Sequence, residues 1–318
     1  MRTVRFHAAA LTLGLMLLSL SSPARASRGT NPFLDYRTES WFLPQSPSVT
    51  GGPVAGLFNP AAFALSDIGG SDFWWNDRSI RSGLDNYGLG LGRTLNFAMN
   101  TTTFGDTRES YKIYDYQIGL AGGSRDHTFG MAYRWSRGET QRVDRQQALV
   151  IGATSRQRNW LSFGASGVFS LESGAAQYVF DMGLRPFQKD YLTVFADWAV
   201  NDDETFFSGG AWSAGLEVRP VDGVHLGVRA REQLGSGQVD YSALLGVTLG
   251  FTNFAALPQY DHDGNLQQTS FLVRSNPPLK GLPGQGLILG KKITYYPLSL
   301  ENRILTYQKF RYFDKKRV

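Results

Sequence analysis

A glycine-centred unit repeats along the middle of this chain and limits what the chain can fold into. The glycines that mark successive units lie 31 to 33 residues apart, at Gly88, Gly119, Gly152, Gly183, Gly215 and Gly246. A fixed period of this size indicates a repeat architecture, and helical repeats and paired strands both fit it by length. The side-chain pattern inside each unit distinguishes the two.

That pattern has a period of two. Residues 87–92 alternate large apolar side chains with glycine, and residues 241–251 alternate large apolar with small or polar ones. Such alternation over segments of about ten residues, separated by turn residues, indicates strands. Helices would also tolerate the 36 glycines of the chain poorly, since each costs about 1 kcal/mol in a helix interior. Each unit is therefore predicted to be a hairpin of two antiparallel strands.

The repeat gives a strand count. We expect twelve strands, near residues 70–78, 86–92, 95–104, 111–122, 127–136, 144–154, 159–169, 174–184, 190–200, 208–218, 224–232 and 239–254. Even numbers are typical of single-chain bacterial barrels. The sequence therefore predicts an all-β fold, an antiparallel transmembrane β-barrel of about 12–14 strands whose wall spans residues 70–254.

The C-terminal residues 255–318 leave two interpretations open. Two further strands near 268–274 and 286–296 would extend the barrel to fourteen. Alternatively, this basic extension is a periplasmic linker that leads into a missing domain. It holds ten Lys and Arg against four Asp and Glu.

The first 26 residues have the features of a cleaved signal peptide. Arg2 and Arg5 precede an apolar run over residues 8–20, and Pro23-Ala24-Arg25-Ala26 offers small residues at a cleavage site. The run is shorter than the ~20 apolar residues of a spanning helix. We therefore expect export, cleavage after Ala26, and an N-terminal periplasmic or hatch segment over residues 27–69.

Export and aromatic placement favour a membrane barrel over the alternative, a soluble β-sandwich. Aromatic residues lie near the ends of the expected strands, for example Trp75, Trp135, Trp198 and Trp212. Such aromatic girdles are typical of barrels in membranes. We therefore predict location in the cell outer membrane, with outer-membrane lipid and lipopolysaccharide as surroundings.

The net charge gives no reason to expect a nucleic-acid partner. The formal charge is +5, but three arginines lie in the signal peptide, so the mature chain carries 5 − 3 = +2. The basic extension holds 10 − 4 = +6 of that, which leaves 2 − 6 = −4 for residues 27–254.

A segment before the first strand predicts a plug for the lumen. Residues 48–66 are apolar, through Val54, Leu57 and Phe63, yet two prolines prevent them from joining a strand ladder. A lumen of 12–14 strands is wide enough to need filling. We therefore expect this segment inside the barrel, with Asn59 bonded to inward-facing groups of the wall and Pro60 fixing the bend.

The run Thr50 to Ala64, with Asn59-Pro60-Ala61 at its centre, resembles the N-terminal motif of the FadL/PorV-like outer-membrane barrels. The repeated Gly-Leu-x-x-Arg-Pro turn, as in Gly215 to Pro220, also resembles that family. The resemblance covers roughly residues 48–254. It implies that Asn59, Pro60 and Ala61 are hatch residues. It also implies a passive channel or transporter for small or hydrophobic compounds, or a structural anchor.

The resemblance also suggests partners. The strand that ends at Phe254 is similar to the signal read by the barrel-assembly machinery, and family members carry hydrophobic small molecules. The expected loops are short, which favours an anchoring or channel role over fatty-acid uptake. The basic extension suggests an alternative function, the membrane-anchoring N-terminal part of a larger exported serine protease of the signal peptide peptidase family.

The sequence shows no complete catalytic site, and we expect no enzyme, cofactor or metal in this chain. The four histidines have no ligand spacing, and no Gly-x-Ser-x-Gly motif occurs. Charged residues on strands should face the lumen. We therefore expect lumen charges at Asp115, Arg134 and Asp181, with Arg134 paired to one of the two carboxylates.

A barrel whose chain enters from the periplasm also has a predicted orientation. The turns around residues 125, 156, 186 and 220 should face the periplasm, and the loops near 105–110, 137–143 and 201–208 the exterior. Cysteines introduced at both sets and labelled on intact cells test this. Label at position 156 but not at position 204 would contradict the assignment.

Overall fold

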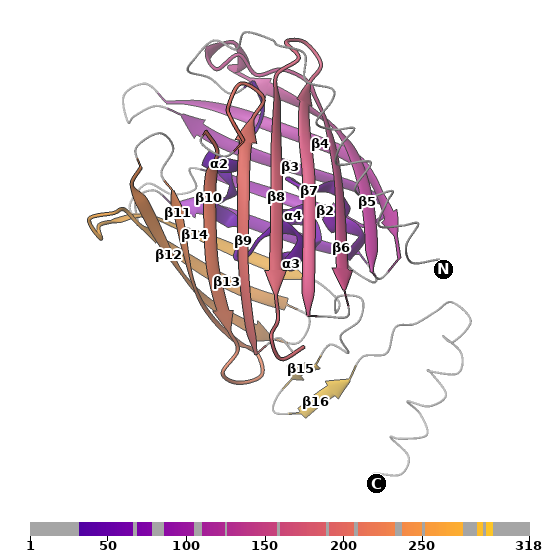
Figure 1. The fold of residues 1–318 in the computed structure, drawn as a ribbon, viewed down its shortest axis with the longest axis vertical. Helices are drawn as coiled ribbons and strands as arrows, with labels where there is room; N and C mark the ends of the chain where they lie inside the picture. Colours follow the sequence, from indigo (N-terminus) through magenta and orange to yellow (C-terminus); the bar gives the residue numbers. More distant parts are fainter. Residues whose placement is uncertain are drawn as a thin grey trace.

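The chain forms a closed barrel of fourteen antiparallel strands around a short helical segment (Figure 1). The computed structural model describes residues 32–65, 69–77, 86–104, 110–124, 126–157, 160–188, 191–206, 209–232, 237–249, 252–275, 285–288 and 291–294. The expected signal peptide, residues 1–26, lies outside them. No helix among the described residues has the length and apolar character needed to cross a membrane.

Each strand of the barrel pairs with its neighbours in sequence, and β1 pairs with β14 to close the wall. The strands are β1 (Gly70–Asp77), β2 (Asn86–Gly92), β3 (Leu95–Phe104), β4 (Tyr111–Gly123), β5 (His127–Gly138), β6 (Ala148–Gln157), β7 (Leu161–Ser170), β8 (Ala176–Leu184), β9 (Leu192–Asn201), β10 (Ala211–Val218), β11 (Val224–Glu232), β12 (Val239–Leu249), β13 (Thr252–Tyr260) and β14 (Leu266–Ser275). The predicted fold class, a barrel of 12–14 strands, is confirmed with fourteen.

The two ends of the barrel carry different connections. One end, called here the turn end, is where β2 leads to β3, β4 to β5, β6 to β7, β8 to β9, β10 to β11 and β12 to β13; β1 begins and β14 ends there. At the other, called the loop end, β1 leads to β2, β3 to β4, β5 to β6, β7 to β8, β9 to β10, β11 to β12 and β13 to β14. A one-turn 3-10 helix, η3 (Thr140–Arg142), lies in one of these loops.

The wall continues past its expected boundary at residue 254. The apolar alternation of residues 239–254 looks like one strand, but β12 ends at Leu249 and β13 begins at Thr252. Both strands keep apolar side chains outward, for example Leu249 and Phe254, so the alternation runs through the turn without a visible break. Phe254 consequently lies inside β13 and pairs with Val273, and the closing strand ends at Ser275.

The second expected strand of the extension, near residues 286–296, is not part of the wall. A separate two-stranded sheet is formed instead by β15 (Gln285–Ile288) and β16 (Lys291–Thr294). The count of fourteen arises in two steps: the expected strand 239–254 is divided between β12 and β13, and the expected strand near 268–274 joins the wall as β14.

The lumen contains the segment before β1, called here the plug and comprising residues 32–65 (indigo in Figure 1). Its elements are α2 (Tyr36–Glu39), η1 (Ser40–Phe42), α3 (Pro47–Thr50), α4 (Gly52–Gly56) and η2 (Pro60–Leu65). Its apolar side chains pack against inward-facing wall residues such as Trp74, Ala98, Val179 and Leu272. The apolar core therefore lies mainly between plug and wall.

Glycines hollow the inner wall where the plug approaches most closely. A Cβ at Gly152 would overlap the Asn59 side chain, and one at Gly183 would overlap Val49. A Cβ at Gly90 would lie 2.7 Å from Cβ of Pro53. Some glycines of the repeat, such as Gly152 and Gly183, thus leave space for the plug.

We predict that Gly88→Val destabilises the barrel, because a side chain at this inward position would overlap the indole of Trp74. Overpacking of this kind typically costs about 1–3 kcal/mol. The urea midpoint of the refolded protein in detergent, followed by heat-modifiable gel mobility, measures the effect.

Gly122→Val is the matched control, since a Cβ there meets nothing within 4 Å among the described atoms. Equal midpoints for the two variants would contradict the close packing of Trp74 on β2.

Candidate functional site: a plug bonded to the barrel wall

The plug runs through the lumen from the loop end to the turn end and back. At the loop end, the backbone N–H of Gln146 donates to the carbonyl of Pro32 (2.7 Å). At the turn end, the Arg156 guanidinium donates to the carbonyl of Ser48 (2.7 Å). The chain then returns through α4 and η2 to mid-barrel, where η2 packs on β4, β5 and β6. The plug therefore obstructs the lumen along its length.

Asn59, Pro60 and Ala61 lie inside the barrel at the turn between α4 and η2. Asn59 is fully buried, and its Nδ2 donates to the wall carbonyls of Ala153 (3.3 Å) and Ala165 (3.5 Å). Its Oδ1 accepts the backbone N–H of Ala61 (3.1 Å). Pro60 begins η2. That these three residues act as a hatch stays a prediction.

Wall arginines bond to the plug backbone along its path. These bonds have lengths of 2.7–3.2 Å: Arg156 donates to the carbonyls of Ser48 and Val49, Arg229 to that of Leu43, Arg231 to that of Ser40, and Arg274 to that of Thr50. Arg134 donates to the carbonyls of Leu34 and Leu57, and Arg145, in the loop before β6, to that of Phe33. The helices of the plug are only three to six residues long, so many of their carbonyls lack an intrahelical partner. The arginines supply partners to some of these carbonyls, such as those of Val49 and Thr50.

Wall carboxylates and amides bond to backbone N–H groups of the plug. Asp72 accepts from the N–H of Val54 (2.8 Å), and Asp181 from that of Ser48 (2.8 Å). Gln177 Oε1 accepts from the N–H of Tyr36 (2.8 Å). The wall thus binds both polarities of the plug backbone.

Several wall arginines also form buried ion pairs inside the lumen. Arg274 pairs with Asp72 at 2.9 Å, and Arg229 with Asp197 at 2.9 Å. Buried charges are costly unless paired. Asp72 therefore has two roles, since it neutralises Arg274 and holds the plug at Val54.

Asp115, Arg134 and Asp181 all have buried side chains that face the lumen, but their partners differ from the expected ones. The Arg134 guanidinium donates to Gln117 Oε1 (2.8 Å) and to plug carbonyls. Asp115 accepts from Ser136 (2.6 Å) and from Arg145 (3.3 Å). The sequence predicts a periplasmic or hatch segment over residues 27–69, but it does not place residues 32–47 inside the lumen. Their polar side chains look suited to water, yet Arg37 pairs with Glu204 of the wall loop at 2.7 Å.

Among the described residues, no group of three or more His, Asp and Glu side chains could hold a metal ion. His225 contacts Glu217 (2.9 Å) and Thr248 (2.8 Å) near the turn end, and His262 contacts Gln238 (3.1 Å) at the loop end. These histidines therefore lie at opposite ends of the barrel.

No family model and no curated protein matches the sequence. Among solved structures, engineered variants of the Rhodopseudomonas blastica porin are similar to this chain. One aligns with a TM-score of 0.41 at 10% identity, and a triple mutant with 0.40 at 10%; both alignments cover 66% of this chain and 98% of the porin. At these values the similarity does not bear on function, and the barrel assignment rests on the strand order. Membership of the FadL/PorV-like family stays a prediction.

We predict that Arg274→Leu strongly destabilises the folded protein, because it leaves Asp72 charged and unpaired in the lumen. Removing one partner of a buried pair costs about 3–5 kcal/mol. The free energy of unfolding of the refolded protein in urea measures it.

Arg142→Leu is the control, because Arg142 pairs with Glu139 at 2.6 Å with both side chains about half exposed. Exposed pairs contribute about 0–1 kcal/mol. An equal loss in the two variants would contradict the role of the Arg274–Asp72 pair.

Proposed function

We propose that this chain is an outer-membrane β-barrel whose plug closes the lumen at rest, and that small polar solutes pass when the plug is displaced. The observation that carries the proposal is the charged inner wall bonded to a continuous segment of the same chain.

The outer surface is suited to lipid. Outward-facing strand positions carry exposed apolar side chains, including Phe73, Ile118, Met182, Val228 and Leu245. Among the described strand residues, the charged side chains that alternation places outward are Asp77, Lys112, Arg137 and Glu232, all within two residues of a loop-end terminus. Charges face inward elsewhere, as expected of a membrane barrel. The strands of the wall have 7–13 residues, close to the length of about 9–11 residues that a tilted span needs.

Aromatic side chains mark the loop end of this surface. Trp75 stacks on Phe271 with ring centroids 5.0 Å apart, and Tyr116 on Trp135 at 5.5 Å. Such rings favour the membrane interface. We place the turn end in the periplasm and the loop end outside, as the predicted orientation requires. Val221 (60% exposed) and Leu171 (57%) are better labelling positions than Arg156, whose guanidinium is bonded to the plug.

The lining favours polar solutes over the hydrophobic compounds that the family resemblance also allows. Wall groups now bonded to the plug, including Asp72, Arg134, Asp181, Arg229 and Arg274, would line a water-filled passage once it moves. A hydrophobic solute would leave these groups without partners, which is costly.

A second candidate function is a structural anchor, favoured by the number of bonds that would have to break for the plug to move. In that case the lumen never opens. The related sequence-based alternative, an anchor for a following protease domain, concerns residues outside the described part of the chain and stays a prediction.

A reversible crosslink distinguishes these functions. Ser48 Oγ on the plug lies 3.3 Å from Ser162 Oγ on β7, and the chain has no cysteine. In Ser48→Cys/Ser162→Cys we expect the oxidised protein to show no openings in planar bilayers. The reduced protein should open as the unmodified one does, and each single variant controls for its substitution.

Deletion of residues 32–65 should then give a steady conductance, in protein shown to be folded by heat-modifiable mobility. Openings that persist in the oxidised double variant, or an unchanged conductance after deletion, would overturn the plugged channel. Openings seen only after deletion would favour the anchor.

A further inference from the structure

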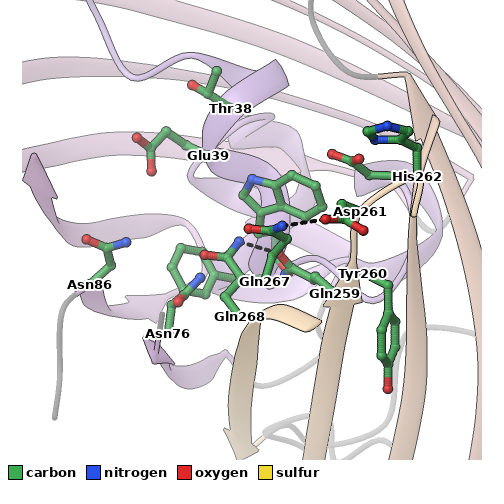
Figure 2. A pocket seen from close by; sticks show the side chains of 13 residues that line it. Thr38, Glu39, Asn76, Asn86, Gln259, Tyr260, Asp261, His262, Gln267 and Gln268 are labelled. Carbon is green, nitrogen blue, oxygen red and sulfur yellow. Dashed lines mark hydrogen bonds between the residues drawn. The ribbon is translucent and has the colours of Figure 1, made fainter. Parts of the chain in front are cut away.

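A polar pocket of about 560 Å³ lies at the loop end between the plug and the wall (Figure 2). Its lining comes from α2 and η1 of the plug and from β1, β2 and β12–β14 with their loops, namely Thr38, Glu39, Trp41, Phe42, Asn76, Asn86, Asp240, Gln259, Tyr260, Asp261, His262, Gln267 and Gln268. Its volume is within the range of small-molecule sites. None of these residues takes part in the bonds between arginines and plug carbonyls described above.

Phe42, which lines the pocket on the plug side, packs against a buried aromatic residue of the wall. Phe42 is 2% exposed and lies 6.1 Å, centroid to centroid, from the fully buried Trp74. Trp74 is fixed in turn, because its Nε1 donates to Asn100 Oδ1 (2.8 Å). The pocket is therefore a recess at the mouth of the barrel.

Five side-chain amides line the pocket, and most are held in place. Gln259 donates to Ser270 (3.0 Å) and accepts from Gln268, while Gln267 donates to Asp261 (2.8 Å); the dashed lines of Figure 2 mark the last two. Asn86 Oδ1 accepts the backbone N–H of Thr103 (2.7 Å), which leaves its amide nitrogen for the pocket. Fixed amides of this kind give specificity for groups that both donate and accept hydrogen bonds.

Two acceptor atoms at the pocket lack a partner. Asn76 is 2% exposed, and its Nδ2 donates to Ser270 (3.3 Å), but its Oδ1 has no hydrogen-bond partner among the described residues. Oδ1 of Asp240 is likewise buried without one. A buried acceptor without a donor costs about 1–3 kcal/mol. Both atoms therefore require donors from a ligand or from water.

The charge of the lining excludes anionic ligands. The pocket holds the carboxylates of Glu39, Asp240 and Asp261 but no Lys or Arg side chain. Hydrogen bonds, chiefly from the backbone N–H of Asn265, lower the pKa of Asp261, so this carboxylate is charged at neutral pH. A phosphate or carboxylate ligand would be repelled.

We propose that this pocket binds a neutral mono- or disaccharide. Hydroxyl groups supply the donors that Asn76 and Asp240 need, and they also accept from the amide N–H groups around them. The ring of Trp41 lines the pocket and offers an apolar surface for a sugar ring. The Arg231 guanidinium lies over one face of this indole, 4.1 Å from the ring centroid. The class of ligand follows from the pocket alone. Only the statement that the pocket faces the exterior rests on the proposed function.

The test uses the full chain refolded in detergent, with heat-modifiable mobility as the check of folding. Isothermal titration and tryptophan fluorescence are followed with glucose, galactose, maltose and lactose, and with spermidine and glucose 6-phosphate as charged probes. We expect at least one neutral sugar to bind and glucose 6-phosphate not to bind. Asn76→Leu should lower the affinity for the sugar roughly tenfold, because a buried hydrogen bond to the ligand is lost.

Asn96→Leu is the matched control, since Asn96 is also 2% exposed on an inward-facing strand position but lies on β3 near the turn end; it should bind sugar as the unmodified chain does. If Asn76→Leu fails to fold, Gln267→Ala is tested instead, because Gln267 is at an exposed position. It should also lower the affinity for the sugar roughly tenfold.

Binding of spermidine alone, lost in Asp240→Asn, would replace the proposal with a polyamine site. No binding of any sugar to correctly folded protein would overturn it. Neither result would affect the conductance of the crosslinked and deleted variants, so the pocket and the plugged channel fail separately.

Discussion

The structure depends on satisfying the plug backbone inside a lumen that the plug itself fills. Plug residues such as Leu34, Leu57 and Asn59 are 0–1% exposed, so water cannot serve their peptide groups. Helices of three to six residues leave many of these groups without an intrahelical partner. Long, forked arginine side chains reach them from the wall, and each guanidinium offers five donors. Carboxylates such as Asp72 must then accompany the arginines, because an unpaired buried charge is unstable.

The apolar outer face and the polar inner face of the wall could be predicted from the sequence, because apolar and polar side chains alternate along each strand. In β8 the inward positions include Gln177 and Asp181, and the outward ones include Tyr178 and Met182. A lipid-facing surface and a polar lumen both follow from a period of two. The plug core was also predictable, since residues 48–66 combine apolar side chains with two prolines and suit neither a strand nor water.

The partners of the buried charges could not be predicted in the same way. Arg134 and Asp115 belong to adjacent, paired strands, β5 and β4, yet Arg134 lies opposite Gln117 in the register, and Asp115 opposite Ser136. A shift of two residues decides which carboxylate an arginine reaches, and sequence spacing does not fix that shift. The path of residues 32–47 through the lumen could not be predicted for a related reason. Their polar groups, such as Arg37, match wall partners that are distant in sequence, here Glu204.

The pocket and the plug are not independent, because plug residues such as Glu39 and Trp41 form one side of the pocket while wall residues such as Asn76 form the other. A ligand that contacts both sides has more contacts when the plug is docked than when it is displaced. It must therefore favour the docked state by the difference in binding free energy. Occupancy of the exterior recess would then oppose opening, and a solute that promotes passage would have to act on surfaces that only the displaced plug exposes.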